Sequence, residues 1–584
     1  MNANLIILLC VIPLVAGVLN VFLINRRTAS RIVGVASYVA VLGLALRFLL
    51  YTAPLEGAAS ILVSQMGDWK APFGITIVFD SLSGLLIAAA AMVALCSYIH
   101  SFSSLDPAVE RRYYHPLMQM LLFGVNMSFL TGDLFNLFVA FEVMLMSSYA
   151  LLVIGTGLKQ MRQAYKYILL NVLASTIFLM AAGMVYGMFG TLNIADLARI
   201  VAEIEADPNR ALPTGFTPLA VMFLLVFGLK GAFFPLWFWL PDTYYTIPIA
   251  VAGLFGGLLT KVGVYTVARL FPLIFASNGA GSMVDGVYTG GMSQPIQVIL
   301  IVAAAFTMFL AVLGAVSQHE VRRILSVHVI SQVGYMVFGI AVMSGNALAG
   351  CAFYMIQHMV VKCALFLCCG VMEKHAGTDD LDKLGGLLKR DWKLGVLFFI
   401  AAMSLVGLPP LSGFFGKMVI IREGFVEGQW YLAVVGLVTG ALTLLSMLKI
   451  WSYGYWNPSP PNGYPAKTEP AAVRTGNRAA YFAIAMLVAT ALFLGFGAEQ
   501  IYTVAFKAGR QLQNPEAYIT AVLGEDAYDQ AEHLILVHHE GTHLSDAAAA
   551  PSLDRSEPTQ PAEASENADT VGRIAHAAPE EMTQ

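Results

Sequence analysis

The sequence is poor in charge: Asp, Glu, Lys and Arg make up 12% of its 584 residues, whereas hydrophobic residues make up 58%. A typical soluble domain has about twice that charged fraction. Apolar runs of about 20 residues recur along the chain, and each is long enough to cross a hydrocarbon core of roughly 30 Å. The composition therefore excludes an ordinary soluble domain and indicates a polytopic membrane protein. Because lipid offers the backbone no hydrogen-bond partners, the spans are expected to be α-helices.

Cysteine, nucleotide-binding motifs and basic patches are also scarce. The six cysteines fall inside predicted spans without metal-site or disulfide spacing, so we interpret them as small buried hydrophobes. The chain has no cysteine cluster for iron–sulfur ligation and no G-x-G-x-x-G between a strand and a helix. We therefore expect no cofactor and no electron transfer by this chain alone. No basic stretch is interleaved with aromatics, which argues against a nucleic-acid partner.

The N-terminus MNANLIILLCVIPLVAGVLNVFL lacks the basic stretch of a signal peptide, so it is predicted to remain as the first span. The loops after spans 1, 3, 5, 9, 11 and 13 hold most of the Lys and Arg residues, which predicts that these loops are cytoplasmic and that both termini lie outside. Fourteen spans are predicted, near residues 3–24, 31–51, 82–103, 113–131, 133–155, 165–189, 215–238, 247–273, 296–316, 323–343, 348–372, 395–421, 430–452 and 478–498.

Two segments differ from the spans. LNIADLARIVAEIEA, between spans 6 and 7, is amphipathic and is predicted to lie along the membrane surface. The segment 525–584 is rich in Ala, Glu, Pro, Ser and Asp, and is predicted to be an extramembrane, mostly disordered tail. Four histidines in its HLILVHHEGTH run could bind a metal, but nothing beside them supports a site, so no metal site is predicted there: His533, His538, His539 and His543.

A few charged side chains fall inside the apolar spans. Glu142 lies near the middle of LFNLFVAFEVMLMSSYALLVI. A charge at the centre of a bilayer costs about 2.5–3.5 kcal/mol on insertion scales, so such residues face the protein interior, pair with one another or border water. Four lysines and two histidines have the same unusual location: Lys230, Lys261, Lys362, Lys417, His328 and His358.

These residues permit a structural and a functional interpretation. A single buried Lys–Glu pair can simply join two helices, and a lone buried histidine is usually a satisfied core residue. Structural pairs need matched opposite charges, however, and this set has more lysines than carboxylates. An apolar environment disfavours the charged form of a lysine, so a buried ammonium can release and regain a proton near neutral pH. We therefore predict that these residues form a proton relay.

Prolines interrupt the predicted helices near two of the lysines. A proline inside a helix removes a backbone hydrogen bond, and irregular backbone at membrane depth is tolerated only inside protein or beside a wet cavity. Broken helices in two halves of a chain favour an inverted repeat, with spans 4–8 and 9–13 as the units and with Lys230 and Lys417 in equivalent positions. The prolines at the predicted breaks are Pro235, Pro241, Pro409 and Pro410.

Five motifs between about residues 70 and 455 occur in the order typical of one family. Because of these motifs, the chain resembles the antiporter-like membrane subunits of respiratory complex I and of multisubunit Mrp-type sodium/proton antiporters. Two further stretches, FYMIQHMVVKCALF and NPEAYITAVLG, are similar to the Mrp branch. The five motifs are FNLFVAFEVM, GLKGAFFPLWFWLPD, GLLTKVGVY, RRILSVHVISQVGYM and SLVGLPPLSGFFGK.

The resemblance implies an all-α polytopic fold with about fourteen transmembrane helices. It implies two inverted five-helix repeats, TM4–8 and TM9–13, with discontinuous TM7 and TM12. The corresponding segments are 1–112 with TM1–3, 113–275 with the first repeat, 276–455 with the second repeat, 456–524 with TM14 and a C-terminal helix, and the tail 525–584.

The resemblance also assigns roles by position. Glu142 matches a glutamate of helix 5 that pairs with Lys230 on helix 7. Lys261 matches the lysine of helix 8 that links two half-channels. The remaining relay residues belong to helices 10, 11 and 12: His328, His358, Lys362 and Lys417.

Three functions agree with these features. The first is an ion-translocating subunit of a multisubunit monovalent cation/proton antiporter in a prokaryotic cell membrane, with other subunits, Na⁺, H⁺ and lipid as partners. The second is a proton-pumping subunit of a complex I-like oxidoreductase or membrane-bound hydrogenase, and the third is a scaffold subunit that conducts nothing. NPEAYITAVLG and the lysine at position 417 favour the first. Since no redox motif is found, we expect a transporter subunit and not an enzyme.

Overall fold

Helices form almost the whole of the described chain, which confirms the predicted fold class. Eleven of the described helices are long and apolar enough to cross a membrane, and two further apolar helices are shorter. The total of fourteen spans and the inverted repeats stay predictions. The tail 525–584, with its four histidines, lies outside the described residues. The computed structural model describes residues 3–155, 157–207, 209–277, 283–284, 287–288, 291–292, 294–458 and 477–524.

The elements follow one another with short connections. The helices are α1 (Leu8–Phe22), α2 (Arg27–Thr52), α3 (Ser81–Ser104), α4 (Pro107–Glu110), α5 (Tyr114–Leu130), α6 (Leu134–Val153), α7 (Leu158–Phe189), α8 (Ile194–Ala206), α9 (Phe216–Gly231), α10 (Leu240–Thr246), α11 (Ile249–Ile274), α12 (Gln294–Ser317), α13 (Val321–Val342), α14 (Gly345–Ala376), α15 (Leu387–Arg390), α16 (Trp392–Val406), α17 (Ser412–Val426), α18 (Trp430–Ile450), α20 (Arg478–Phe496), α21 (Ala498–Gln513) and α22 (Pro515–Leu523). Strands β1 (Leu62–Gln65) and β2 (Thr76–Phe79) pair as an antiparallel hairpin, and β3 to β6, of two residues each, form two more antiparallel pairs.

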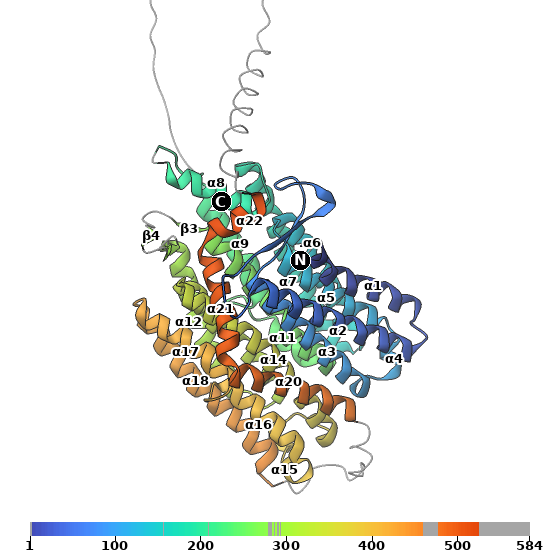
Figure 1. Cartoon of the computed structure of the whole chain (residues 1–584). Coiled ribbons are helices and arrows are strands. Elements are labelled where there is room, and N and C mark those ends of the chain that lie inside the picture. Colours follow the sequence, from blue (N-terminus) through green and yellow to red (C-terminus); the bar gives the residue numbers. More distant parts are fainter. Residues whose placement is uncertain are drawn as a thin grey trace, which may run out of the picture. The chain divides into compact units, whose positions relative to one another are not determined.

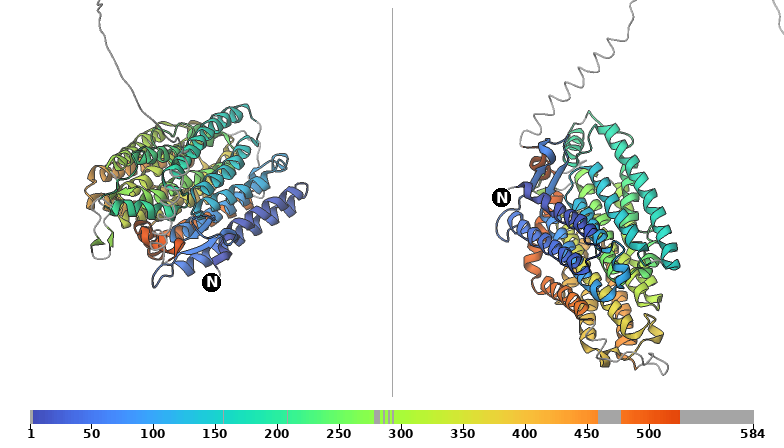
Figure 2. Two further views of the ribbon diagram at one scale, coloured as in Figure 1. Left: turned by 90° about the horizontal axis from the view of Figure 1, so that it is seen from above. Right: turned by 90° about the vertical axis from the view of Figure 1, so that its right-hand side faces the viewer.

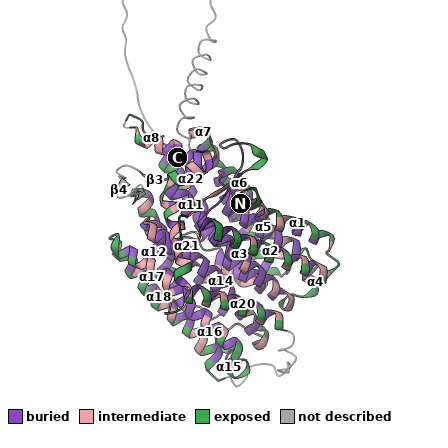
Figure 3. Cartoon of the chain, in the orientation of Figure 1, coloured by how far each residue is buried: buried purple, intermediate pink, exposed green. Residues whose placement is uncertain are grey.

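Three helices, α11, α13 and α14, lie in the interior of the bundle, and α11 and α14 are labelled in Figures 1 and 3. The most apolar stretch of α11 is 100% buried and those of α13 and α14 are 94% buried, against 39% for α1 and α2. Figure 2 shows α1 and α2 in front when the right-hand side of the bundle faces the viewer. The outer helices present exposed apolar side chains such as Phe22 and Leu50, as a lipid-facing surface requires. Polar side chains on the inner helices therefore lie among other protein groups.

Two apolar segments are interrupted, in agreement with the prediction from their prolines. Residues 232–239 separate α9 from α10, and residues 407–411 separate α16 from α17. Pro241 lies instead in the first turn of α10, where a helix accepts proline because the N–H there has no helical partner. That proline therefore begins a helix and does not interrupt one. The interruptions contain the other three predicted prolines: Pro235, Pro409 and Pro410.

The described ends of the chain lie on one side of the bundle. Residues 3–7 and α22 both contact β1. Helix α22 also packs on α8, the predicted amphipathic helix, whose Arg199 pairs with Asp196 and Glu203 at 2.8 and 2.6 Å. This arrangement agrees with an even number of spans, and the outside location of both termini stays a prediction. Residues 1–527 form one compact unit, within which the predicted segment boundaries are untested predictions.

A buried ion pair joins three elements on this side. Asp80 accepts a hydrogen bond from the N–H of Ser83 at the start of α3, and its carboxylate lies 2.5 Å from the guanidinium of Arg269 on α11. Tyr518 of α22 places its ring centre 5.6 Å from the same guanidinium. The sequence pattern did not single out either charge. Because each charge has its counter-charge, the pair serves as a structural connection.

A second charge cluster lies at the start of α2, among the loops predicted to be cytoplasmic. Glu110 is almost fully buried and lies 2.5 Å from Arg27 and 2.7 Å from Arg31. Burial alone would raise the pKa of Glu110, but hydrogen bonds from His115, Arg31 and Arg27 hold it at about 2. The carboxylate therefore stays ionised at neutral pH and ties the start of α2 to α4.

Candidate functional site

Glu142 and Lys230 are brought together through a third side chain, Ser175. The Ser175 hydroxyl on α7 donates a short hydrogen bond to the Glu142 carboxylate on α6. The same hydroxyl accepts a hydrogen bond from the Lys230 ammonium on α9 at 3.4 Å. Lys230 is 4% exposed, whereas Glu142 is partly exposed. The predicted pairing of Glu142 with Lys230 is therefore indirect, with a serine hydroxyl between the charges.

The polypeptide that follows Lys230 is held by donors and acceptors from other parts of the fold. The Trp239 indole N–H donates to the Leu229 carbonyl at 3.1 Å, close to the end of α9. The Phe234 N–H donates to the buried hydroxyl of Thr307 on α12 at 2.9 Å. Because a buried backbone group without a partner is costly, these contacts stabilise the first interruption. The Lys230 ammonium bonds to the Ser175 side chain, so Trp239 and Thr307 provide the contacts to this backbone.

His358 lies at the centre of a second group of charges. On α14, it interacts electrostatically with Lys261, Lys362, Lys417 and His328. Four of these five residues are 0% exposed, and Lys417 is 6% exposed. Neither ring nitrogen of His358 has a hydrogen-bond partner within the part of the chain that the structure describes. The predicted relay residues from Lys261 onward thus form one cluster inside the protein, away from lipid.

Backbone oxygens hold the lysines of this cluster. The Lys261 ammonium donates to the Gly256 carbonyl at 2.6 Å and to the Thr260 hydroxyl at 3.1 Å. The Lys362 ammonium donates to the Leu325 carbonyl at 2.9 Å. A carbonyl oxygen carries only a partial charge, so the cluster keeps a surplus of positive charge whenever several of its members are protonated.

A series of neutral polar side chains connects His328 with Lys417. A ring nitrogen of His328 is hydrogen-bonded to Ser331 at 3.3 Å, and the Gln332 amide donates to the same hydroxyl at 2.9 Å. The Tyr354 hydroxyl donates to the Gln332 oxygen at 2.5 Å. The ring centre of Tyr354 lies 5.8 Å from the Lys417 ammonium. Hydrogen bonds therefore cover most of the distance, and a cation–π contact completes it.

Lys417 lies against the second interruption. Its ammonium donates to the carbonyls of Leu405 and Val406, the last two residues of α16, at 2.9 and 3.0 Å. The ring centre of Tyr335 lies 4.7 Å away. A lysine at a helix C-terminus is favourable because the unpaired carbonyls there carry partial negative charge.

The two lysines beside the interruptions are not in equivalent positions, which differs from the prediction. Lys230 is in the last turn of α9 and precedes its interruption, whereas Lys417 is in the second turn of α17 and follows it. Both lysines lie beside an interruption, but on opposite sides of it. Their charged surroundings differ as well, since a carboxylate is near Lys230 and helix-end carbonyls are near Lys417.

One step of the predicted line is not bridged. Glu142, Ser175 and Lys230 form one set, and the cluster around His358 forms another. Within the described ranges, no hydrogen bond or ion pair joins Lys230 to Lys261. Helices α9 and α11 do touch there, because a Cβ at Gly263 would lie 2.6 Å from the amide nitrogen of Gly231.

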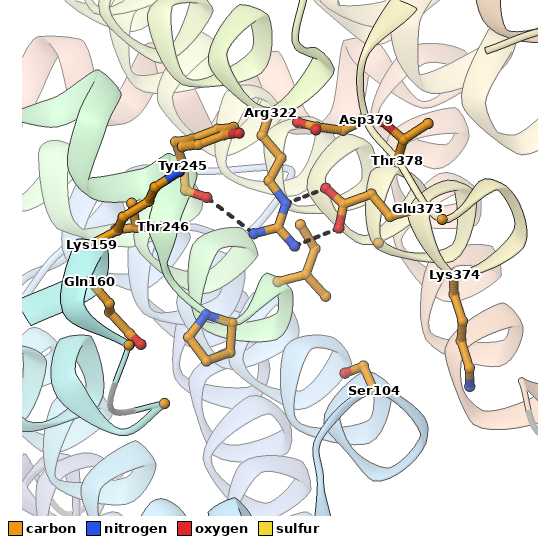
Figure 4. A pocket seen from close by; sticks show the side chains of 16 residues that line it. Ser104, Lys159, Gln160, Tyr245, Thr246, Arg322, Glu373, Lys374, Thr378 and Asp379 are labelled. Atoms are coloured by element: carbon orange, nitrogen blue, oxygen red, sulfur yellow. Dashed lines mark hydrogen bonds and ion pairs between the residues drawn. The ribbon is translucent and has the colours of Figure 1, made fainter. Parts of the chain in front are cut away.

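A pocket of about 800 Å³ opens on the side predicted to be cytoplasmic (Figure 4). Arg322 of α13 extends into it and donates through two nitrogens to the carboxylate of Glu373 on α14. It also donates to the Tyr245 carbonyl at 3.1 Å, so three elements meet at one guanidinium. Burial raises the pKa of Asp379, which also lines the pocket. The pocket lies at the end of α14, the helix that carries Lys362.

The neutral members of the site were not foreseen from the sequence. Ser175 and Gln332 leave a weak signal, since Asn171 and Ser175 are four residues apart in one span, as are His328 and Gln332. Residues spaced by four share a helix face, so such pairs inside an apolar span indicate a polar face turned to protein. Tyr354 leaves no such signal, because tyrosine is common in cores.

Residues 131–443 match the family model described as NADH:quinone oxidoreductase/Mrp antiporter, TM. This range is more than half of the chain and contains every predicted relay residue. The chain belongs to this family. The resemblance inferred from the five motifs is therefore confirmed.

Members of the Mrp antiporter branch match over their full length. The D subunit of the Na(+)/H(+) antiporter of Alkalihalophilus pseudofirmus is 42% identical, over 89% of this chain and 100% of its own length. The protein of the same name from Bacillus subtilis is 38% identical with the same coverage. A chain in the structure of the Mrp complex from Dietzia sp. DQ12-45-1b is 30% identical, with a TM-score of 0.78 over 90% of this chain and 100% of that one. The fold and the sequence therefore point to the same branch of the family.

Proposed function

We propose that this chain is the D-type subunit of a multisubunit monovalent cation/proton antiporter in a bacterial plasma membrane, and that it moves protons through its buried charges. The cluster of lysines and histidines around His358 is the observation that carries the proposal. Four of these five side chains lie on the inner helices α11, α13 and α14, and all five are buried, so a charge without function would be costly there. The two bacterial relatives, both named as D subunits of Na(+)/H(+) antiporters, support the coupling to sodium. The chain is on this proposal a transporter subunit, with other antiporter subunits, lipid, Na⁺ and H⁺ as its partners.

The cluster suits proton transfer because its members compete for charge. Lys261, Lys362 and Lys417 surround His358, and each ammonium repels the next across an apolar interior. Protonation of one group therefore promotes release of a proton from a neighbour. The unpartnered ring nitrogens of His358 can donate or accept at the centre of the cluster. Charge can thus advance by short proton transfers without movement of whole helices.

Two further sets of residues extend the relay at its ends. The Ser175 hydroxyl is hydrogen-bonded to both the Glu142 carboxylate and the Lys230 amine, which is an arrangement that can pass a proton. The pocket around Arg322 and Glu373 provides space for water on the predicted cytoplasmic side. Helix α14 leads from this pocket to Lys362 and His358, so we place proton access there.

Everted membrane vesicles that contain the whole antiporter complex test the proposal. The host lacks other sodium/proton antiporters, respiration acidifies the vesicle interior, and a fluorescent dye reports the gradient. Addition of NaCl should discharge the gradient, whereas choline chloride should not. A redox pump would instead move protons on addition of an electron donor, without any response to sodium.

Substitutions separate a relay from a scaffold. Lys362→Met removes a charge from the centre of the cluster and should abolish the sodium response in complexes that still assemble. Thr176→Ala is the matched control, because Thr176 is exposed and its hydroxyl bonds to its own helix. A normal sodium response in assembled Lys362→Met complexes would establish the scaffold alternative.

A further inference from the structure

The last four carbonyls of α16 are divided among different donors. The first accepts from backbone N–H groups that follow the helix. The second, of Ser404, accepts from the Gln357 amide at 3.3 Å. The last two, of Leu405 and Val406, accept from the Lys417 ammonium at 2.9 and 3.0 Å. The negative end of this half-helix therefore holds a cation, and backbone oxygens supply the contact.

Further oxygen atoms lie at the same end of α16. We name this set the α16 cradle: the carbonyls of Leu405 and Val406 with the side chains of Gln357, Ser404 and Ser412. The hydroxyls of Ser404 and Ser412 lie 2.7 Å apart. The Gln357 side-chain oxygen is fully buried and has no hydrogen-bond partner among the residues described. A buried acceptor without a donor is costly, so it is available to a cation.

The chain is shaped to keep this region tight. A Cβ at Gly413 would lie 1.9 Å from the Ser404 carbonyl oxygen, so glycine alone allows α17 to start against the end of α16. A cavity of about 490 Å³ lies beside Val406, Gly407 and Lys417. The lysine side chain therefore has space into which it can withdraw, while the oxygen atoms stay in place.

At the first interruption, the lysine bonds to a side chain and not to helix-end carbonyls. There the Leu229 carbonyl is occupied by the Trp239 indole, and the Lys230 ammonium is bonded to Ser175. A cation-binding arrangement of backbone oxygens therefore distinguishes the second interruption from the first.

We propose that the α16 cradle binds Na⁺ in exchange for the ammonium of Lys417. The proposal rests on the antiporter function proposed above, and it identifies where the sodium ion binds in this chain. Carbonyls of unwound helices and the C-terminal ends of half-helices coordinate Na⁺ in other transporters. The oxygen atoms that accept N–H donors from an ammonium present the same partial charge to a dehydrated Na⁺.

The exchange balances in charge and protons. The Lys417 ammonium gives one proton to water or to the neighbouring cluster, and its two N–H···O bonds to Leu405 and Val406 break. The neutral amine withdraws, and one Na⁺ binds the freed oxygen atoms. The cradle holds one positive charge before and after the step, so one proton is exchanged for one sodium ion.

Sodium binding to the purified complex tests this exchange. The probe is NaCl, compared with choline chloride at equal ionic strength, and the readout is the sodium-induced rise in unfolding temperature. In the wild type, the apparent Na⁺ affinity should fall by about tenfold for each pH unit below neutral, because the ammonium competes for the cradle. Lys417→Met keeps the oxygen atoms but removes the competitor, so its Na⁺ affinity should be at least about tenfold higher at neutral pH and nearly independent of pH. Equal pH dependence in both proteins would overturn the proposal.

Transport gives a second measurement. Ser412→Ala removes one oxygen atom of the cradle and should raise the Na⁺ concentration for half-maximal flux by about tenfold, with little change in maximal flux. Ser128→Ala is the matched control, since this buried serine bonds to its own helix on α5. An unchanged sodium requirement in Ser412→Ala would count against the cradle. If the wild-type complex shows no sodium-dependent proton flux in vesicles, the proposed antiporter function is rejected. The binding measurement on the purified complex tests the cradle separately, because it does not require transport.

Discussion

Lys230 and Lys417 each lie beside an interruption between two helices, but the protein compensates their charges differently. A serine hydroxyl connects Lys230 to a carboxylate, so the ammonium has a full counter-charge one side chain away. Lys417 has two backbone carbonyls and two tyrosine rings, which offer partial charges only. A lysine such as Lys230 has a carboxylate partner that can itself be protonated. A lysine such as Lys417 can be replaced by another cation.

This difference shows why two similar interruptions can perform different steps. At the first interruption, the Thr307 hydroxyl and the Trp239 indole bond to two backbone groups beside the break, and on our proposal Lys230 exchanges protons with Glu142. At the second, the Leu405 and Val406 carbonyls bond to the Lys417 ammonium, and on our proposal Na⁺ can take its place. The four changes below test this distinction, beginning with the largest expected effect.

Removal of the counter-charge in the first half should have the largest effect. Glu142→Ala leaves the buried ammonium of Lys230 without its counter-charge, and the lysine then persists in one protonation state. Sodium-driven proton flux in vesicles should fall to background while a blot shows normal assembly. Glu142→Asp keeps the charge but shortens the reach, so partial flux should remain. Normal flux in assembled Glu142→Ala complexes would show that the carboxylate has a structural role.

Replacement of each lysine by arginine should separate the two sites. Arginine keeps the charge but does not release its proton at physiological pH, so both Lys230→Arg and Lys417→Arg should lose nearly all flux. The planar guanidinium can still pair with Glu142, whereas its shape does not suit two carbonyls at one helix end. The unfolding temperature should therefore fall by several degrees in Lys417→Arg and stay near the wild type in Lys230→Arg. Full flux in Lys230→Arg would mean that this lysine does not need to titrate.

Loss of the bridging hydroxyl should have an intermediate effect. Ser175→Ala removes the group that bonds to both Glu142 and Lys230, so proton transfer between them must use water or a direct approach. We expect flux to fall by about tenfold, the equivalent of one hydrogen bond to a charged group. Thr176→Ala, one residue further along α7, should behave as the wild type. If Ser175→Ala retains full flux, the serine is a spacer and not a step in the relay.

The smallest effect is expected at the backbone of the first interruption. Thr307→Val preserves shape but leaves the buried Phe234 N–H without its acceptor, at a cost of about 1–3 kcal/mol. The unfolding temperature should decrease while flux remains within about twofold of the wild type. Thr266→Val is the control, because the Thr266 hydroxyl bonds to its own helix. An equal decrease in both variants would indicate that the Thr307 contact gives no special support to the break.

Local signals explain what could be predicted from the sequence. Apolar runs identified the spans, charges in those runs identified Glu142 and the lysines, and prolines identified both interruptions. All of these are properties of a few neighbouring residues. A lysine within an apolar span can be assigned to the protein interior from the sequence, because exposure of its charge to lipid is costly.

Contacts between distant segments explain what could not be predicted. Ser175 lies 33 residues from Glu142 and 55 from Lys230 along the chain. No local sequence pattern predicts that the Ser175 hydroxyl lies between the Glu142 carboxylate and the Lys230 ammonium. The position of Lys417 at the end of α16 depends on how tightly α17 turns back at Gly413. Arg269 was overlooked because it lies near a span boundary, and its partner Asp80 belongs to a segment far away.

The stack of Asp80, Arg269 and Tyr518 has a consequence for biogenesis. Arg269 enters the membrane region long after Asp80 has been synthesised, so its counter-charge is already at the start of α3 when α11 arrives. The ring of Tyr518 is added only when translation reaches α22. A polypeptide released before that point leaves one face of the guanidinium uncovered and α8 without its packing partner. Synthesis of α22 therefore adds the aromatic contact of this ion pair and the packing partner of α8 in a single late step.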